Sequence, residues 1–244
     1  MNKKVLLLLF LAGVLILLFL FGIYYPYFEK FDKGYLTICF DDGYISTYNY
    51  SFPLMKEYNF KGVLYLISEL NEFEGRELMS FSQAKEMQDY GWEIGSHTLT
   101  HQDLRSLNPE EAEAEIRDSK KVLEEKGFVI KSFAYPFGKY SSNLEKIVKE
   151  NYLSSRIFNT FFDYNYFNTN KYRLKTKSTS IDLSAENLCS EINKANERKV
   201  WLIITFHDLN NERYWDYPKE KFKQVLDCIR DSGIKVVKIS DMVK

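Results

Sequence analysis

Two kinds of hydrophobic pattern alternate along the chain. Short apolar runs of strand length are separated by longer stretches in which apolar positions recur at helical spacing. The short runs predict strands over Tyr35–Phe40, Gly62–Ile67, Trp92–Gly95, Ser132–Tyr135, Ser154–Phe158, Val200–Phe206 and Ile234–Ile239. The longer stretches predict helices over Ser46–Tyr58, Ser82–Tyr90, Pro109–Lys126, Asn143–Asn151, Ala185–Arg198 and Lys219–Ser232. Residues 159–180 follow neither pattern and are expected to form irregular strands and loops.

The alternation of strands and helices determines the expected fold. Strands that alternate with helices in this way form parallel sheets. No break in composition divides the chain after residue 34, so we predict one α/β domain with a closed or nearly closed (β/α) barrel. In such a barrel the reactive side chains stand at the carboxyl ends of the strands.

The N-terminus carries the longest apolar run of the chain. Val5–Ile23 contains no charged residue and is long enough to cross a membrane, which takes about 20 helical residues. A cleaved signal peptide would have a shorter apolar region and a small-x-small cleavage site, whereas aromatic residues follow here, as in an interfacial belt. We expect a transmembrane helix as a single-pass anchor over residues 1–24, a linker over 25–34 and a catalytic domain over 35–244. Lys3 and Lys4 favour an extracytoplasmic position for that domain.

The composition narrows the range of functions. With 45% apolar and 27% charged residues the chain can build an ordinary hydrophobic core. A formal net charge of -1 offers no basic excess to neutralise phosphates, so nucleic acid is not an expected partner. The three cysteines lack a CxxC spacing and are expected to be small buried hydrophobes.

Every histidine of the chain comes shortly after a predicted strand. His97 and His101 follow the third predicted strand, and His207 follows the sixth. Asp41 and Asp42 follow the first strand in the same way. If the barrel forms, these five side chains lie at the end where barrels place their active sites.

The spacing of these residues suits a metal ion. His97 and His101 are four residues apart, so one helical turn would point both imidazoles in the same direction. Thr98 follows His97 where zinc proteases carry a glutamate, so the third ligand and the general base must come from elsewhere. Asp41 and Asp42 can supply both, because adjacent residues at a strand end point in different directions, so one carboxylate can bind the metal while the other stays free. An Asp-Gly sequence also suits a plain turn. The same ligand set occurs in non-haem iron oxygenases, but those present it on antiparallel strands.

Four segments together resemble the ordered motifs of a known family. They are Cys-Phe-Asp-Asp-Gly (39–43), Ser-His-Thr-Leu-Thr-His (96–101), Phe-Ala-Tyr-Pro-Phe-Gly (133–138) and Leu-Ile-Ile-Thr-Phe-His-Asp (202–208). In this order they are similar to the polysaccharide deacetylase (NodB-homology) family of carbohydrate esterases. The resemblance implies a distorted (β/α) barrel of seven or eight strands. It also implies one divalent metal ion, with zinc as the first choice and cobalt, nickel or manganese as alternatives.

The resemblance implies a role for each residue that matches a family motif. The metal ligands would be Asp42, His97 and His101. Asp41 would be the general base that deprotonates a water, and His207 would be the general acid that protonates the leaving group. The backbone N–H of Phe137, where the family usually has Tyr, would stabilise the oxyanion together with the metal.

The sequence departs from the family pattern at two points. Many members carry an arginine in the third motif that orients the base, whereas Ala134 stands at that position here. This form of the motif is similar to a subgroup that includes poly-N-acetylglucosamine deacetylases. We predict that Arg156, on the next strand, supplies the guanidinium for Asp41. The element of the fourth motif that tunes the acid is not evident, and Asp163 is its nearest candidate.

Aromatic residues near the motifs are candidate sugar contacts, because flat rings can stack on pyranose rings. The candidates are Tyr135, Tyr164, Tyr166, Tyr214, Trp215 and Tyr217. Packing of these rings at the rim of the barrel is the alternative.

We therefore expect a metal-dependent hydrolase of a carbon–nitrogen amide bond, which removes acetyl groups from N-acetylated sugars of a cell-surface or secreted polysaccharide. Two alternatives stay open. One is a catalytically weakened carbohydrate-binding protein on the same fold, suggested by Ala134 and the unclear fourth motif. The other is a hydrolase of a small non-sugar amide. The retained base and acid argue against the first alternative, and the anchor argues against the second.

Overall fold

Seven parallel strands close into a barrel in the computed structural model, which describes residues 10, 12–14, 16, 17, 30–158 and 164–243. In barrel order the strands are β1 (Tyr35–Phe40), β2 (Val63–Leu66), β5 (Glu93–Ser96), β6 (Ile130–Ala134), β7 (Ser154–Phe158), β9 (Leu174–Ser178) and β10 (Trp201–Phe206). The barrel closes because β10 also pairs along the full length of β1. The predicted barrel of seven or eight strands is confirmed. The expectation for residues 159–180 is wrong in part, because β9 in this segment pairs in parallel with β7 and β10 as a regular barrel strand.

Short strands extend this barrel at its margins. β11 (Lys235–Val236) pairs in parallel with β1, and β8 (Tyr164–Asn165) pairs antiparallel with β10. The hairpin of β3 (Glu72–Phe73) and β4 (Arg76–Glu77) stands apart as its own two-stranded sheet. The predicted strand Ile234–Ile239 is wrong in its second half, because Ile239 begins a short helix instead.

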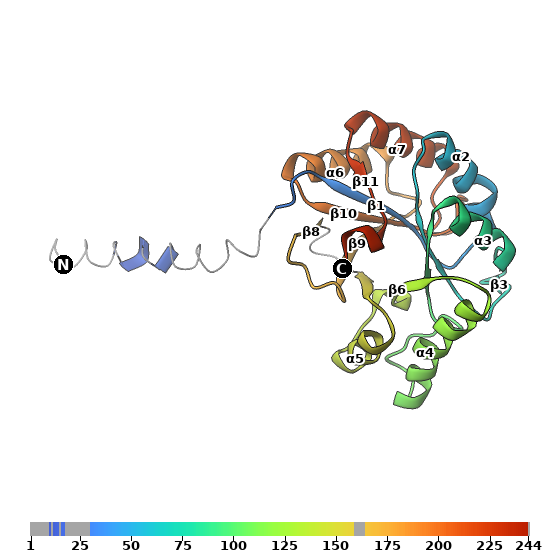
Figure 1. Ribbon diagram of the computed structural model, residues 1–244. Coiled ribbons are helices and arrows are strands. Elements are labelled where there is room, and N and C mark those ends of the chain that lie inside the picture. The colour runs from blue at the N-terminus through green and yellow to red at the C-terminus, as the bar shows by residue number, and fades with distance from the viewer. Residues whose placement is uncertain (1–9, 11, 15, 18–29, 159–163, 244) are drawn as a thin grey trace.

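Helices surround the barrel, as Figure 1 shows. They are α2 (Phe52–Glu57), which follows the π-helical turn η2 (Thr47–Ser51), and α3 (Phe81–Tyr90), α4 (Pro109–Glu125), α5 (Ser142–Asn151), α6 (Ala185–Arg198) and α7 (Lys219–Ser232). The short C-terminal helix α8 (Ile239–Met242) lies across one end of the barrel instead. Each of the six predicted helices is found within two residues of its predicted ends, with the first divided between η2 and α2. The start of α4 has a capping box, in which Asn108 and Glu111 each accept a hydrogen bond from the other's backbone N–H.

The strands are apolar on both faces because both faces are buried. On β1, Leu36, Ile38 and Phe40 belong to the large cluster that the helices cover. Cys39 belongs to the second cluster, inside the barrel, with Ala134 of β6. Side chains alternate along a strand with a period of two. The residue that follows Cys39 by two positions, Asp41, is therefore directed into the barrel.

The end of the barrel where β1 begins is closed by the C-terminal helix. Ile239 of α8 is fully buried in the cluster inside the barrel, and the backbone N–H of Ser240 donates to the Glu93 carboxylate. The chain enters the barrel at this same end, at Tyr35. The carboxyl ends of the strands lie at the opposite end, which is where the predicted site residues follow them.

The predicted membrane anchor falls almost entirely outside the described residues. Residues 10, 12–14, 16 and 17 are helical, and the apolar side chains of Phe10, Ile16 and Leu17 are 69%, 59% and 67% exposed. Among the residues that the structure describes, no helix is both long enough and apolar enough to span a bilayer. The anchor stays a prediction.

Candidate metal and catalytic site

The carboxyl ends of three strands bring the predicted residues together. Asp41 and Asp42 follow β1, His97 follows β5, and His207 follows β10. Because Phe40 and Phe206 are paired at the ends of β1 and β10, Asp41 and His207 emerge side by side, and the Asp41 N–H donates to the Phe206 carbonyl at 2.9 Å.

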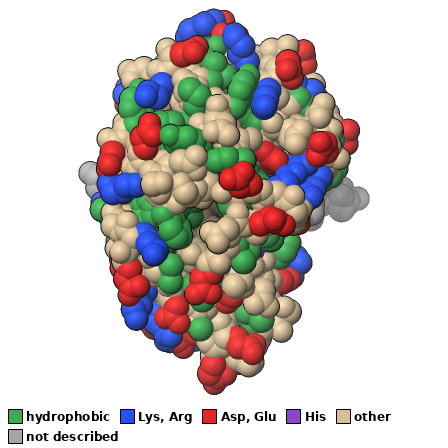
Figure 2. Space-filling model, turned by 90° about the vertical axis from the view of Figure 1, so that its right-hand side faces the viewer, with side chains coloured by type: hydrophobic (Ala, Val, Ile, Leu, Met, Phe, Trp, Pro, Cys, Tyr) green, Lys and Arg blue, Asp and Glu red, His purple; other side chains and the backbone are tan. Residues whose placement is uncertain are grey.

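These side chains line one cavity of about 360 Å³. The remaining predicted site residues around it are His101, Tyr135, Phe137, Arg156 and Trp215. Figure 2 views the molecule from the side on which β3 lies in Figure 1, and acidic and basic side chains are interspersed there around hydrophobic ones. The cavity therefore joins the predicted metal, acid and base residues in one site.

Three side chains could hold a metal ion. The Asp42 carboxylate oxygen lies 3.5 Å from His97 Nε2 and 3.4 Å from His101 Nε2, and the three candidate ligand atoms are within 4.8 Å of one another. Such distances are long for N–H···O hydrogen bonds. They match the edges of about 3.4 Å expected between ligands bound to one tetrahedral zinc at about 2.1 Å.

The two histidines meet through a strained loop and not through a helical turn. Residues 97–101 are not helical, and Thr98 and His101 have positive φ angles of 71° and 63°. Asp42 also has a positive φ, of 69°. The predicted helical geometry of the pair is thus wrong, although its consequence, two converging imidazoles, is correct. Positive φ is costly for residues with a side chain and concentrates at functional sites.

A buried glutamate on α4 holds this loop in place. The Glu115 carboxylate accepts hydrogen bonds from the backbone N–H groups of Leu99 and Thr100, at 2.9 and 3.0 Å, and from the Thr100 hydroxyl. Sequence reasoning missed this residue. A signal was present, because Glu115 lies three residues from the buried Ala112 and so occupies the apolar stripe of an amphipathic helix, where an acid needs a partner.

Burial prepares both histidines to bind a cation. His97 Nδ1 lies 2.8 Å from the Ala134 carbonyl, which can only accept, so Nδ1 carries the proton and Nε2 is free to act as a ligand. Burial lowers the pKa of His97 to about 4 against the opposing charge of Asp41. Burial, aided by His97, lowers the pKa of His101 to about 3. Both rings are therefore neutral at ordinary pH, as metal ligands must be.

Asp42 is the group that most clearly needs a cation. Its side chain is buried, and its Oδ1 atom has no hydrogen-bond partner in the described structure. Burial and the adjacent charge of Asp41 raise the pKa of Asp42 well above its ordinary value. A divalent ion held with His97 and His101 would give the Asp42 oxygen a partner and would neutralise its buried negative charge. The residues present therefore fit such an ion.

Asp41 already has a charged partner. Arg156 Nη2 donates to both carboxylate oxygens of Asp41 at 2.6 Å, and both side chains are buried. This is the contact that the sequence predicts. Burial alone would raise the pKa of Asp41, but Arg156, His97 and His207 together lower it below its ordinary value. Ala134 and Arg156 are register partners on β6 and β7, so the guanidinium enters the barrel at the level where the family motif has its arginine.

The two residues predicted to complete the chemistry lie at the cavity edge. His207 Nε2 is 4.0 Å from Asp41, and burial lowers the pKa of His207 although Asp41 opposes the shift. Its Nδ1 has no partner among the described residues, and Asp163, the candidate that would tune it, lies outside them.

Phe137 has φ 57° in the turn after β6, whose hydrogen bonds are donated by Gly138 and Lys139. The Phe137 N–H takes no part in them.

The predicted sugar contacts are only partly at the site. Tyr135 and Trp215 line the cavity, and the Trp215 ring is 5.9 Å from the His207 ring. Tyr214 is 58% exposed and packs edge-on against Trp215 without lining the cavity. Tyr164 of β8 is paired with Leu202, near the start of β10, and so lies toward the opposite end from His207. Tyr217 is buried against Phe206 in the core.

Comparison with protein families identifies one match. A family model described as Polysaccharide deacetylase matches residues 29–154. The chain is 31% identical over 126 residues to YxkH of Bacillus subtilis (strain 168), a protein named for the same family, and this match covers 50% of the chain and 43% of YxkH. The chain spans less than half the length of the curated relatives it matches.

Solved structures share the barrel. The Streptococcus pyogenes deacetylase PplD, in complex with acetate, matches with a TM-score of 0.57 and 27% identity over 64% of this chain and 69% of that one. The Bc1960 peptidoglycan N-acetylglucosamine deacetylase matches with a TM-score of 0.63 over 90% of this chain and 94% of that one. At 16% identity the second likeness concerns the fold alone.

Replacing Glu115 by alanine should weaken metal binding. The variant removes the acceptor that orders the 97–101 loop, and outer-shell partners of this kind are typically worth about 10- to 100-fold in metal affinity. Zinc titration by calorimetry measures the affinity, with Glu113→Ala, on the exposed face of the same helix, as the control. Equal affinities for the two variants would contradict the role of Glu115.

Proposed function

The chain belongs to the polysaccharide deacetylase family, and we propose that it hydrolyses the acetamido groups of N-acetylated sugars in a cell-surface or secreted polysaccharide, in a metal-dependent reaction. One observation carries the proposal. A buried Asp42 oxygen, which has no hydrogen-bond partner among the described residues, converges with two neutral imidazoles beside an Asp41 that Arg156 keeps ionised. That arrangement offers a cation site and a separate general base in the same cavity.

Asp42, His97 and His101 would hold the divalent ion. When bound, the ion would supply Lewis-acid polarisation of the acetyl carbonyl and would acidify a water. Zinc suits one carboxylate and two imidazoles, and cobalt, nickel and manganese are alternatives with the same donor set. The ligand roles of these three residues are part of the proposal.

Asp41 acts as the general base. Its carboxylate is ionised because Arg156 stabilises the charged form in a buried setting. It takes a proton from the water as the water oxygen attacks the acetyl carbon. Arg156 also fixes the direction of the carboxylate, since its Nη2 contacts both oxygens.

His207 and Phe137 act on the other side of the reaction. The Phe137 N–H donates to the oxyanion of the tetrahedral intermediate. The carbon–nitrogen bond then breaks, and His207 gives its proton to the leaving sugar amine while acetate is released. Because burial lowers the pKa of His207, its imidazolium is a stronger acid than usual and is confined to lower pH.

The sugar ring is bound beside the acid. Trp215 is half-exposed next to His207, and Tyr135 forms part of the cavity wall. The names of the relatives support an acetylated sugar, since YxkH is named for polysaccharide and PplD was solved with acetate. An amide is the preferred substrate over an O-acetyl ester, because an amine leaves only once its nitrogen is protonated, whereas a sugar alkoxide depends less on a proton from His207.

The two alternatives have less support. A carbohydrate-binding protein without activity was suggested by Ala134, but Arg156 lies against Asp41 at the same level of the barrel. A hydrolase of a small non-sugar amide does not require the half-exposed Trp215 at the cavity.

We also propose that residues 1–24 anchor the domain to a membrane, with the domain outside the cytoplasm. The uncharged run Val5–Ile23 and the exposed apolar side chains of Phe10, Ile16 and Leu17 support this placement. The described chain enters the barrel at the end where β1 begins, opposite the site, which supports a site that opens away from the membrane.

Acetate release tests the proposed activity. We expect the protein to release acetate from N-acetylglucosamine oligomers, to lose this activity with a chelator and to regain it with zinc. Asp41→Asn should retain zinc binding and lose at least about 100-fold in kcat, because it removes the base. The proposed activity would be refuted if the zinc-loaded protein released no acetate from chitin-like, peptidoglycan or poly-N-acetylglucosamine substrates.

Removing the guanidinium should move the pH profile. Arg156→Ala removes the charge that most strongly opposes the effect of burial on Asp41, so the pKa of Asp41 rises. Because only the ionised base works, the acid limb of kcat/KM shifts to higher pH and activity at neutral pH falls at least about tenfold. Adding Ala134→Arg to this variant should restore part of the activity, since residue 134 enters the barrel at the same level. An acid limb that stays in place would show that Arg156 does not act on the base.

Membrane extraction tests the anchor. The full chain should resist alkaline carbonate extraction and be digested by protease added to intact cells. The double variant Ile16→Lys/Leu17→Lys should leave the membrane fraction, because each lysine at the centre of a spanning helix costs about 2.5–3.5 kcal/mol. Wild-type protein found in the soluble fraction would refute the anchor, and protection from the protease would refute the orientation.

A further inference from the structure

Two segments far apart in the sequence meet beside the cavity. One is the β3–β4 hairpin, between β2 and α3, and the other is the loop 207–218, between β10 and α7. Ion pairs cross between them in both directions. Arg76 of the hairpin reaches Asp208, Glu212 and Asp216 of the loop, and Arg213 of the loop reaches Glu74 of the hairpin. These six residues are called the clasp below.

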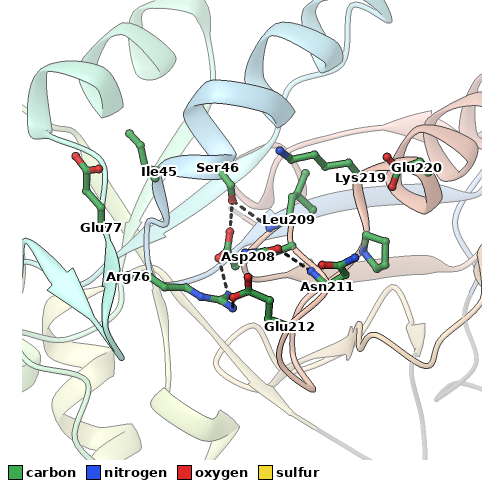
Figure 3. A pocket seen from close by; sticks show the side chains of 12 residues that line it. Ile45, Ser46, Arg76, Glu77, Asp208, Leu209, Asn211, Glu212, Lys219 and Glu220 are labelled. Carbon is green, nitrogen blue, oxygen red and sulfur yellow. Dashed lines mark hydrogen bonds and ion pairs between the residues drawn. The ribbon is translucent and has the colours of Figure 1, made fainter.

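Arg76 lies at the centre of the clasp. Its Nη1 is 2.6 Å from both Asp208 Oδ2 and Asp216 Oδ1, and its Nη2 is 3.1 Å from Asp216 Oδ2 and from Glu212. Figure 3 shows Arg76 extended toward Asp208 and Glu212, with Ser46 on the far side of Asp208. The planar fork of a guanidinium can bond several carboxylates at once, which a lysine cannot do.

The part of the clasp around Arg76 is bonded to the backbone of the loop and is largely shielded from water, whereas the pair of Arg213 and Glu74 is partly exposed. The side chains of Arg76, Asp208 and Asp216 are only 13%, 9% and 3% exposed. Asp216 Oδ2 also accepts from the backbone N–H groups of Glu212 and Arg213, at 2.9 and 2.8 Å. The Asp216 carboxylate thus binds both Arg76 and the loop backbone. Breaking the ion pairs would therefore free the loop backbone as well as its side chains.

Each clasped segment presents an aromatic ring to one of the active imidazoles. Phe73 of the hairpin lies 4.6 Å from the His101 ring, between ring centroids, and Trp215 of the loop lies 5.9 Å from the His207 ring. Both rings line the cavity. The clasp thus connects the wall at the candidate metal ligand with the wall at the candidate acid.

We propose that the clasp positions Trp215 as a platform for the sugar ring whose amine leaves, with Arg76 and Arg213 as positioning residues. This inference rests on the proposed deacetylase function. A pyranose ring offers an apolar face that stacks on an indole, and a fixed platform binds it at a lower entropic cost than a mobile one. Loss of the clasp then weakens substrate binding more than it slows the chemical step.

Trp215 gives the clasp a spectroscopic readout of its own. The chain has three tryptophans, and Trp92 and Trp201 are 2% and 3% exposed, whereas Trp215 is 50% exposed. Quenching of tryptophan fluorescence by acrylamide therefore reports chiefly on Trp215. A loosened loop gives a steeper quenching slope whether or not any substrate is turned over.

The test compares Arg213→Gln with the wild type, with Arg230→Gln as the matched control. Arg230 is a surface arginine of α7 that is also ion-paired, with Asp227 and Asp231. For an N-acetylglucosamine oligomer we expect Arg213→Gln to raise KM about fivefold, the scale of a partly exposed ion pair, with kcat within about twofold. Its quenching slope should rise, and Arg230→Gln should match the wild type in both measurements.

Two further variants complete the test. Arg76→Lys, which keeps the charge and loses the fork, should raise KM and the quenching slope at least as much as Arg213→Gln. Glu74→Arg/Arg213→Glu, which exchanges the charges, should recover part of the wild-type KM. Unchanged quenching slopes in Arg76→Lys and Arg213→Gln would overturn the proposal. A raised KM with an unchanged slope would also overturn it, because Arg213 would then contact the sugar directly. Wild-type protein without deacetylase activity would refute the proposed function, and the quenching slopes would still decide whether the clasp holds the loop.

Discussion

Two adjacent carboxylates are buried at the end of β1, and among the residues that the structure describes only one of them has a cationic partner. Asp41 is paired with Arg156, whereas one oxygen of Asp42 accepts no hydrogen bond from any described residue. Burying an uncompensated carboxylate is costly, and a group in that position either takes up a proton or is matched by a cation. The neighbouring His97 and His101, both neutral, make a cation the natural partner. The barrel and its loops hold Asp41 against Arg156 and hold Asp42 beside the two histidines.

The barrel creates the division of labour between the two carboxylates. Strand alternation directs the Asp41 side chain inward to the guanidinium. The positive φ of Asp42 turns the Asp42 side chain in a different direction, toward the histidines. The arginine can come from β7 because Ala134 and Arg156 occupy the same level of neighbouring strands. A guanidinium on β7 can therefore make the contact with Asp41 that an arginine on β6 would make, although the two positions are far apart in the sequence.

Much of the fold and the candidate site follows from local patterns. Apolar runs and helical spacing predict six of the seven barrel strands and the six helices from α2 to α7, because both patterns depend on neighbours a few residues away. The seventh barrel strand, β9, lies in residues 159–180, where neither pattern is present. Asp41, Asp42 and the three histidines stand out because residues that follow parallel strands gather at one end of a barrel. Arg156 is predictable because Ala134 leaves a buried acid without its partner, which the fold must supply from nearby.

Other features depend on contacts that no local pattern reveals. The 97–101 loop has no helical hydrogen bonds, and its conformation depends on Glu115 from a different element. The β3–β4 hairpin has strands of two residues each, too short for any periodicity. The partners of Arg76 are more than 130 residues away, as Asp208 and Asp216 are 132 and 140 residues from it. Spacing within the sequence carries no information about such pairs.

Anomalous diffraction at the zinc edge, from crystals of the protein grown with zinc, locates the ion and shows which carboxylate binds it. We expect one strong peak in the cavity, about 2.0–2.2 Å from an Asp42 oxygen and from Nε2 of His97 and His101, with Asp41 still paired to Arg156. A peak coordinated by Asp41 in place of Asp42, or a cavity without a peak at saturating zinc, would contradict this expectation.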